Sequence, residues 1–267
     1  MKNDISFVAS GRYALFSDPV TRVGGEKCSY HIPTYEALKG IAKSVYWKPT
    51  FLWIIERVRV LRPFRTQTKG VKPIKFARGA NDAPNDLSIY TYLADVAYQV
   101  QARFVWNEHR PELAKDRIDG KHYEIARRMV ARGGRQDVFL GTRDCQGYVE
   151  PCVFGEGPGA YDELDELAFG LMFHGFDYPD ETGGERFGAR FWKPVMRKGV
   201  IEFPGPDDPS LLRKDIRAMS PKAFHPERNF AGCDEEELRR LLLEPETAAY
   251  PDARTLLGGD GPQGGTL

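Results

Sequence analysis

Two adjacent side chains, Lys121 and His122, put a cation beside an imidazole directly after the turn Asp119-Gly120. The apolar residues that follow predict that both lie at the start of a helix, where free N–H groups and the helix dipole favour a phosphate. There the lysine can neutralise phosphate charge while the histidine moves a proton. A histidine beside apolar positions can equally be a packed core side chain, and the dipeptide alone does not separate the two interpretations.

A third candidate, Tyr46, stands at the predicted end of an earlier helix. That helix opens with Thr34 as its N-cap, and Pro49 disfavours helical geometry at the residue before it, so the helix should end near Tyr46. A buried tyrosine hydroxyl needs a hydrogen-bonding partner, although an aromatic in a last helical turn is more often a core residue. If both helices pack on one sheet face, their facing ends can meet at a common groove.

The other histidines do not predict a metal site. No two of them have ligand spacing, and the first half of the chain has no cluster of Asp and Glu, so neither a metal site nor a two-metal nuclease centre is expected. No P-loop, GxSxG or GxGxxG motif occurs, and no cofactor is expected. These histidines are His31, His109, His174 and His225.

Charge is distributed unevenly along a chain whose formal net charge is zero. The stretch from Arg57 to Arg78 holds eight basic residues and no acidic one, whereas the stretch from Glu156 to Glu185 holds nine acidic residues and no Lys or Arg. Such a chain can hold a polyanion with one region and repel it with the other. Either run, taken alone, can also be ordinary solvated surface.

The composition is that of an ordinary globular protein, with 41% hydrophobic and 28% charged residues among 267. The chain starts Met1-Lys2-Asn3-Asp4 without an apolar signal region, and no apolar run approaches the roughly 18 residues that a spanning helix needs. The four cysteines have no CxxC spacing. We therefore expect a cytoplasmic protein with reduced thiols and no membrane contact.

The predicted elements follow the order β-α-β-β-α-β. Alternating or β-branched stretches predict strands, and apolar rows at helical spacing predict helices. The basic segment after Pro63 is interrupted by Gly and Pro and is predicted to be a loop. The predicted strands span 5–16, 51–61, 89–106 and 138–142, and the predicted helices span 34–46 and 121–132.

This order is that of the split βαβ ferredoxin-like unit shared with RNA-recognition domains. The fold class is therefore predicted as α+β, with a ferredoxin-like (RRM-like) domain and a β-rich C-terminal extension. We assign residues 1–147 to the RNA-binding and catalytic domain, 148–257 to the extension and 258–267, which is rich in glycine, to a disordered tail.

Five stretches, in order over more than half of the chain, carry a resemblance to a known family. On them the sequence resembles the CRISPR-associated protein of the fifth Cas family in its catalytically active type I-C form, a member of the repeat-associated mysterious protein (RAMP) superfamily. Asp144 stands where the family pattern has Glu. The stretches are Gly11-Arg12-Tyr13-Ala14-Leu15-Phe16, Val45-Tyr46-Trp47-Lys48-Pro49, Val58-Arg59-Val60-Leu61-Arg62-Pro63, Gly120-Lys121-His122-Tyr123 and Phe139-Leu140-Gly141-Thr142-Arg143-Asp144-Cys145.

The resemblance implies that Tyr46, Lys121 and His122 are catalytic and that precursor CRISPR RNA is cut at the base of its repeat hairpin. It also implies that the protein then caps the 5′ handle of the mature guide RNA. Its partners would be the backbone and large subunits of the type I-C effector complex, with target DNA met only indirectly. In related systems the family only caps, so a non-catalytic RNA-binding subunit is the alternative. A general RNA-recognition module unrelated to CRISPR is a third.

RNA carries its own nucleophile, the 2′-OH beside each phosphate, so the expected reaction is a metal-independent cleavage that leaves a 2′,3′-cyclic phosphate. His122 would act as general base or acid, Lys121 would stabilise the developing charge and Tyr46 would orient the reacting groups. The residues expected to hold the RNA backbone are Arg57, Arg59, Arg62, Arg65, Lys69, Lys72, Arg127, Arg128, Arg132 and Arg135.

Overall fold

The computed structural model describes residues 3–18, 21–22, 26–73 and 87–223. The described helices are α2 (Tyr35–Val45), the 3₁₀ helix η1 (Pro111–Asp116), α3 (Lys121–Ala131) and α4 (Pro179–Thr182). The described strands are β1 (Asp4–Ala14), β2 (Phe51–Val60), β3 (Thr66–Val71), β4 (Ser88–Trp106), β5 (Val138–Phe139), β6 (Gln146–Pro151), β7 (Leu167–Ala168), β8 (Met172–Asp177), β9 (Arg186–Trp192), β10 (Val195–Arg197), β11 (Val200–Glu202) and β12 (Leu212–Ala218). The predicted mixture of strands and helices is confirmed.

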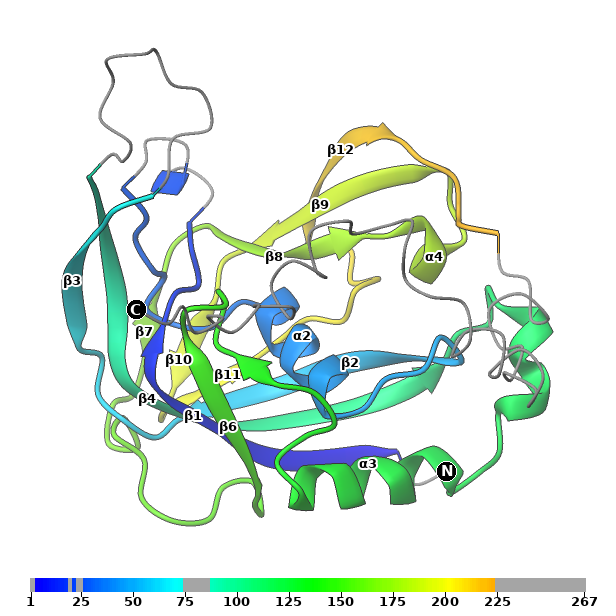
Figure 1. Ribbon diagram of the computed structural model, residues 1–267, viewed down its shortest axis with the longest axis horizontal. Helices are drawn as coiled ribbons and strands as arrows, with labels where there is room; N and C mark the ends of the chain where they lie inside the picture. Colours follow the sequence, from blue (N-terminus) through cyan, green and yellow to red (C-terminus); the bar gives the residue numbers. More distant parts are fainter. Residues whose placement is uncertain (1–2, 19–20, 23–25, 74–86, 224–267) are drawn as a thin grey trace, which may run out of the picture. The chain divides into compact units, whose positions relative to one another are not determined.

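One large sheet organises the fold, with strand order β5-β6-β1-β4-β2-β11-β10-β7 and β3 paired to β4. Its centre consists of long antiparallel ladders, in which Phe7 lies opposite Val100 and Phe51 opposite Trp106. Both α2 and α3 lie against this sheet (Figure 1), and the apolar side chains between helices and sheet form the core. Because β1 and β2 alternate buried with less buried residues over much of their length, they present one apolar face to the helices, whereas the central β4 is buried without interruption from Val96 to Val100.

Local sequence signals set the ends of both long helices. The Thr34 side chain accepts a hydrogen bond from the Ala37 N–H at 3.1 Å, which caps α2 as predicted. Tyr46 is the residue at the other end of α2. After α3 the backbone turns through Gly133 and Gly134, at φ of 82° and 112°, conformations that favour glycine.

The structure differs from the sequence-based predictions at two strands. The segment after Pro63 was predicted as a loop, but residues 66–71 form β3, because the backbone of this polar stretch pairs with β4. The fourth strand was predicted over 138–142, whereas the strand that pairs with β1 is β6, preceded by the short β5. The proposed domain boundary at 147 falls inside β6 and stays a prediction, and the tail 258–267 lies outside the described residues.

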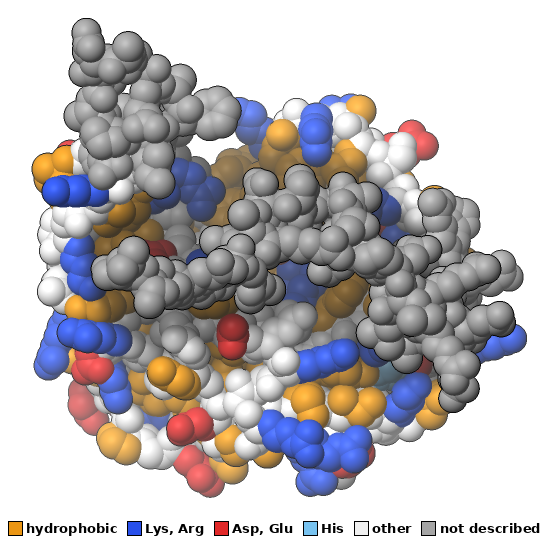
Figure 2. All heavy atoms as spheres, in the orientation of Figure 1, with side chains coloured by type: hydrophobic (Ala, Val, Ile, Leu, Met, Phe, Trp, Pro, Cys, Tyr) orange, Lys and Arg blue, Asp and Glu red, His pale blue; other side chains and the backbone are white. Residues whose placement is uncertain are grey.

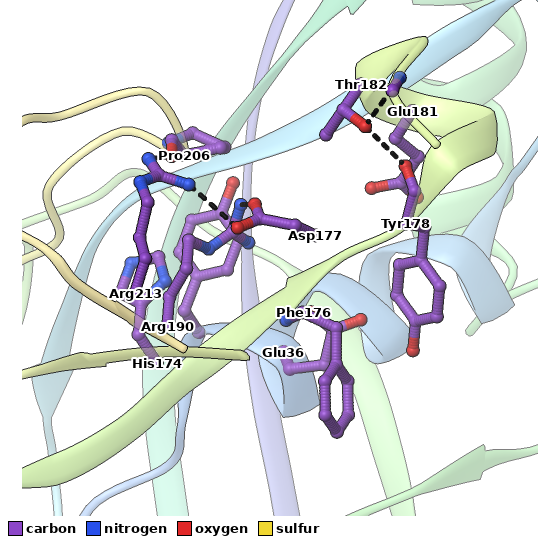
Figure 3. A network of polar contacts seen from close by, with 12 residues as sticks. Glu36, His174, Phe176, Asp177, Tyr178, Glu181, Thr182, Arg190, Pro206 and Arg213 are labelled. Carbon is purple, nitrogen blue, oxygen red and sulfur yellow. Dashed lines mark hydrogen bonds and ion pairs between the residues drawn. The ribbon is translucent and has the colours of Figure 1, made fainter. Parts of the chain in front are cut away.

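A smaller sheet, in the order β12-β9-β8, contacts α2 through the Phe176 N–H of β8, which donates to Glu36 at 3.2 Å (Figure 3 labels both residues). Glu181 of α4 accepts from Lys39 at 3.0 Å and from Lys43 at 2.8 Å, both on α2. Asp177 at the end of β8 lies between Arg190 at 2.7 Å and Arg213 at 2.8 Å. The ion pairs of α4, which follows β8, therefore fix the smaller sheet against α2, the helix that ends at Tyr46.

Cys28, Cys145 and Cys152 are free thiols, and Cys233 lies outside the described residues. None of the described helices combines the length and the apolar character that crossing a bilayer requires.

Candidate active site

Tyr46 and His122 meet although 76 positions separate them in the sequence. The hydroxyl of Tyr46 lies 2.9 Å from Nδ1 of His122. Tyr46 is held in place because its carbonyl oxygen accepts a hydrogen bond from the indole of Trp53 at 2.8 Å. The connection after α3 adds a second restraint, since the Arg135 N–H donates to the last carbonyl groups of α2. The end of α2 and the start of α3 are therefore neighbours, as their common sheet face required.

The imidazole of His122 is enclosed by aromatic rings. Its centroid lies 5.3 Å from that of Phe51, 5.6 Å from that of Trp106 and 6.0 Å from that of Tyr46. His122 is 0% exposed and Tyr46 is 3% exposed. The aromatic wall lowers the local dielectric, which strengthens the hydrogen bonds of the pair and keeps water away from it.

Asp116, at the end of η1, contacts both residues of the Lys121-His122 pair. Its backbone carbonyl oxygen lies 2.7 Å from Nε2 of His122. One carboxylate oxygen, Oδ1, accepts from the Lys121 ammonium at 2.5 Å, and the other, Oδ2, accepts from the Thr50 hydroxyl at 2.6 Å. Oδ2 also lies 3.4 Å from Nε2 of His122. Lys121 itself is largely open to solvent, with a side chain 41% exposed.

The electrostatics of the group keep Tyr46 neutral. Burial, and then the negative charge of Asp116, raise the pKa of Tyr46 to about 12, partly opposed by Arg135. Burial also raises the pKa of Asp116, but the hydrogen bonds from Lys121 and Thr50 outweigh it and hold that pKa below its usual range. Near neutral pH the site thus contains a protonated tyrosine, a carboxylate and an ammonium.

The structure brings together Tyr46, Lys121 and His122, the three residues that the resemblance implied. This set can move a proton along Tyr46 and His122 and present one cation beside them. Sequence reasoning missed Asp116 and Thr50. Both stand in irregular or terminal segments, where no periodicity indicates which way a side chain points, and only the proximity of Asp116 to Lys121 along the chain was a signal.

The arginines of α3 and of the turn after it lie on the surface. Figure 2 shows Lys and Arg side chains gathered over the part of the view where Figure 1 draws α3. Arg127 forms an ion pair with Glu124 at 2.9 Å within the helix. The exposed members of this basic surface are Arg127, Arg128, Arg132 and Arg135.

The basic residues of the β2–β3 region fall into two groups. Arg59 is buried, and its guanidinium binds Asp162 at 2.6 Å and the carbonyl oxygen of Gly157 at 2.8 Å. Arg57 donates to Gln101 at 2.6 Å. Arg62, which pairs with Asp95, and Arg65 and Lys72 are exposed, while Lys69 lies over the ring of Tyr13. Arg59 therefore stabilises the fold, whereas Arg62, Arg65 and Lys72 are open to a ligand.

Much of the acidic stretch is used inside the protein. Besides the pairs of Asp162, Asp177 and Glu181, Asp180 binds Arg110 at 2.7 Å and Glu166 binds Arg197 at 3.1 Å. The negative charge available to repel a polyanion is therefore smaller than the count of nine carboxylates suggests.

Comparison with known proteins identifies relatives over most of the chain. The family described as CRISPR-associated protein (Cas_Cas5) matches residues 5–204. A protein of Mannheimia succiniciproducens named CRISPR pre-crRNA endoribonuclease Cas5d is 27% identical over 76% of this chain and 96% of its own length. A protein of the same name from Thermus thermophilus is 33% identical over 61% of this chain and 71% of its own length.

Among solved structures, one described as the crystal structure of a CRISPR-associated protein has a TM-score of 0.62 and 36% identity. The match covers 75% of this chain and 91% of that chain. The strand-rich mixed fold is therefore common to both.

Proposed function

Because the chain belongs to the Cas5d family of CRISPR-associated proteins, we propose that it is an endoribonuclease that cleaves precursor CRISPR RNA at the repeat hairpin. Two relatives that carry the name of such an enzyme support the substrate. The observation that carries the proposal is the contact of 2.9 Å between the Tyr46 hydroxyl and Nδ1 of His122. It brings a proton-transfer group and a hydroxyl from two distant helices to one point.

The proposed chemistry is an attack of the 2′-OH on the adjacent phosphorus. The 2′-oxygen loses its proton as it bonds to phosphorus, the bond from phosphorus to the 5′-oxygen breaks, and that oxygen takes up a proton. The products are a 2′,3′-cyclic phosphate and a 5′-OH, and no metal ion is needed for the balance. His122 transfers protons, Tyr46 orients the reacting groups and Lys121 stabilises the charge on phosphate.

Cleavage requires access to the His122 ring, which is 0% exposed. Lys121 is the exposed member of the three and is therefore the first to meet a phosphate. Because the Asp116 carbonyl group occupies Nε2, the ring atom that must be uncovered is Nδ1, on the side of Tyr46.

The proposed RNA path uses the exposed basic residues. The α3 surface, Arg127, Arg128, Arg132 and Arg135, lies on the helix that begins with Lys121 and in the turn after it. A second contact region would be Arg62, Arg65, Lys69 and Lys72. Arg57 and Arg59 were predicted with them, and Arg59 would need to leave Asp162 to bind RNA.

The fold and the assembly complete the proposal. We assign β1, α2, β2, β4, α3 and β6 to a ferredoxin-like unit, which the strand order β6-β1-β4-β2 supports. As the sequence resemblance implies, the protein would stay on the 5′ handle as a subunit of a type I-C effector complex, in contact with its backbone and large subunits.

The decisive experiment cleaves a repeat hairpin RNA in EDTA, with and without 2′-deoxyribose at the one nucleotide upstream of the cut. We expect the all-ribose RNA to be cut in EDTA and the deoxy RNA to be bound but not cut, because only the nucleophile is missing. Analysis of the upstream product should find the cyclic phosphate. Efficient cutting of the deoxy RNA would refute the mechanism and the roles of the three residues.

The alternative is a non-catalytic subunit that only caps the guide RNA. The complete burial of His122 favours this reading, because a ring enclosed by aromatics can serve packing alone. The same experiment separates the two, since a capping subunit binds both RNAs and cuts neither.

A further inference from the structure

We propose that Asp116 is a positioning residue for the cleavage reaction. It fixes which nitrogen of His122 carries a proton, and it holds Lys121 until a phosphate takes its place. This inference rests on the proposed function, and it adds to the implied set of three a residue that does not itself touch the reacting atoms.

The proton position follows from the chemistry of the partners. A backbone carbonyl oxygen can only accept, so the contact of 2.7 Å from Asp116 places the proton of the neutral ring on Nε2. Nδ1 then has a lone pair, and the Tyr46 hydroxyl donates to it at 2.9 Å. Both hydrogen bonds therefore point the same way: Tyr46 donates to Nδ1 of His122, and Nε2 of His122 donates to the Asp116 carbonyl oxygen. Nδ1 is the nitrogen that can take up a further proton.

The Asp116 carboxylate supplies the matching charge. When Nδ1 takes up a proton the ring becomes a cation, and Oδ2 at 3.4 Å from Nε2 stabilises it, as the aspartate of a Ser-His-Asp triad does. The titratable or charged groups at the ring and its partners are Tyr46 after α2, Asp116 at the end of η1 and Lys121 at the start of α3, with Arg135 acting on Tyr46. The neighbouring strands β2 and β4 contribute the rings of Phe51 and Trp106. Asp116 is the one anion in this set.

The same carboxylate prepares Lys121 for RNA. An ion pair that is 41% and 31% exposed on its two sides is weak, so an arriving phosphate can draw the ammonium away from Oδ1. The carboxylate does not follow, because the hydroxyl of buried Thr50 holds Oδ2 at 2.6 Å. Asp116 therefore releases Lys121 while it continues to orient His122.

The first test measures the protein without RNA. Nitrogen chemical shifts of the His122 ring, from two-dimensional NMR near pH 8, should identify a neutral ring with its proton on Nε2. A ring protonated on Nδ1, or an even mixture, would overturn the inference. This readout does not depend on cleavage, so it stands even if the proposed activity fails.

The second test compares Asp116→Asn with Asp119→Asn in single-turnover cleavage of the hairpin RNA. Asp119 is an exposed carboxylate three residues later, and its variant controls for the change in total charge. Asp116→Asn should lose about 10- to 100-fold in rate with RNA affinity within about two-fold of the wild type.

Two further variants close the test. Asp116→Glu keeps the charge and should recover part of the rate, whereas Thr50→Val keeps all charges but frees Oδ2 and should slow cleavage by a smaller factor. If Asp116→Asn fails to fold, the cleavage rate of Thr50→Val tests the inference instead. A Thr50→Val rate equal to that of the wild type contradicts it. Equal rates for Asp116→Asn and Asp119→Asn, or a loss of affinity that parallels the loss of rate, would also overturn it.

Discussion

The Tyr46 hydroxyl can give a hydrogen bond but holds its proton firmly, because its pKa is raised to about 12. A phenolate that strips the 2′-OH would be rare near neutral pH, so its use is to orient His122 and the RNA. Tyr46→Phe keeps the ring and removes only the hydroxyl. We expect a loss of about 10-fold or more in single-turnover rate, with little change in affinity or melting temperature. A large drop in melting temperature would instead assign the hydroxyl to folding.

His122→Ala should lower the cleavage rate by at least about 10²-fold and leave hairpin affinity within a few-fold. Because the ring fills a site 0% exposed, the variant also leaves a cavity and should melt at a lower temperature. Rate and affinity should therefore be measured well below that temperature, with His122→Phe as a variant that refills the space. A parallel collapse of affinity in both variants would make His122 a packing residue.

His174 offers a test of stability against pH. Burial, and then the charge of Arg190, lower the pKa of His174 to about 3. Its Nε2 lies 3.1 Å from the Pro204 carbonyl oxygen, and its Nδ1 has no partner in the described part of the chain. His174 therefore stays unprotonated in the folded protein at pH values below about 6.5, where the same histidine in the unfolded chain binds a proton. This stability is complete above that pH and is lost progressively as the pH falls toward 3.

Mutation of His174 tests how steeply the unfolding free energy falls with pH. His174→Phe should reduce the dependence of unfolding free energy on pH, between about pH 6 and 4, by up to about 1.4 kcal/mol per pH unit. Denaturant titrations at several pH values measure it. His31→Phe, which makes the same replacement at an exposed histidine, is the control.

The helices that could be predicted from the sequence are those with a capping or helix-breaking residue at their ends. Thr34 and Pro49 marked both ends of α2, and the glycine pair after α3 marked its end, because caps and breakers act on their own neighbours. β3 carries no such signal, since Thr66–Val71 is mostly exposed and is a strand only because β4 lies beside it. The contact between Tyr46 and His122 was expected from the fold, whereas Asp116 lies in an irregular connection and could not be placed.

The short α4 joins two elements of the candidate site. Glu181 binds Lys39 and Lys43 of α2, while its neighbour Asp180 binds Arg110, directly before η1. Burial opposes ionisation of Glu181, but the two lysines outweigh it and lower the pKa of its carboxyl group. The stability from these pairs is therefore present above about pH 4.5 and lost as the pH falls below it.

Glu181→Gln should lower the unfolding free energy by about 1 to 3 kcal/mol, because among the described residues it leaves the buried Lys39 with Glu36 as its one remaining anionic partner. The matched control is Glu166→Gln, whose pair with Arg197 is exposed on both sides and should matter by less than about 1 kcal/mol. Equal effects in urea titrations would show that α4 is not a tie between elements.

The molecule as a whole has a formal net charge of zero, but parts of its surface, such as β3 and the residues beside it, are basic. Replacing Arg65, Lys69 and Lys72 by Ala should weaken RNA binding and reduce the slope of log affinity against log salt by about two units. The control replaces Lys193, Lys214 and Arg217, exposed residues on other strands and loops, and changes the net charge equally. If both triple variants lower the slope alike, the RNA path does not run over β3.

The pairing of β11 with β2 has a consequence for synthesis on the ribosome. Arg59 is translated 141 positions before Val200, its partner in the ladder. At a translation rate of about 5 to 20 residues per second, roughly 7 to 28 seconds pass between the synthesis of β2 and that of β11. During this time the backbone hydrogen-bonding groups at that edge of β2 are open to other chains. We expect codon choice and growth temperature to govern the soluble yield of this protein, and nascent chains stalled before residue 200 to need a chaperone.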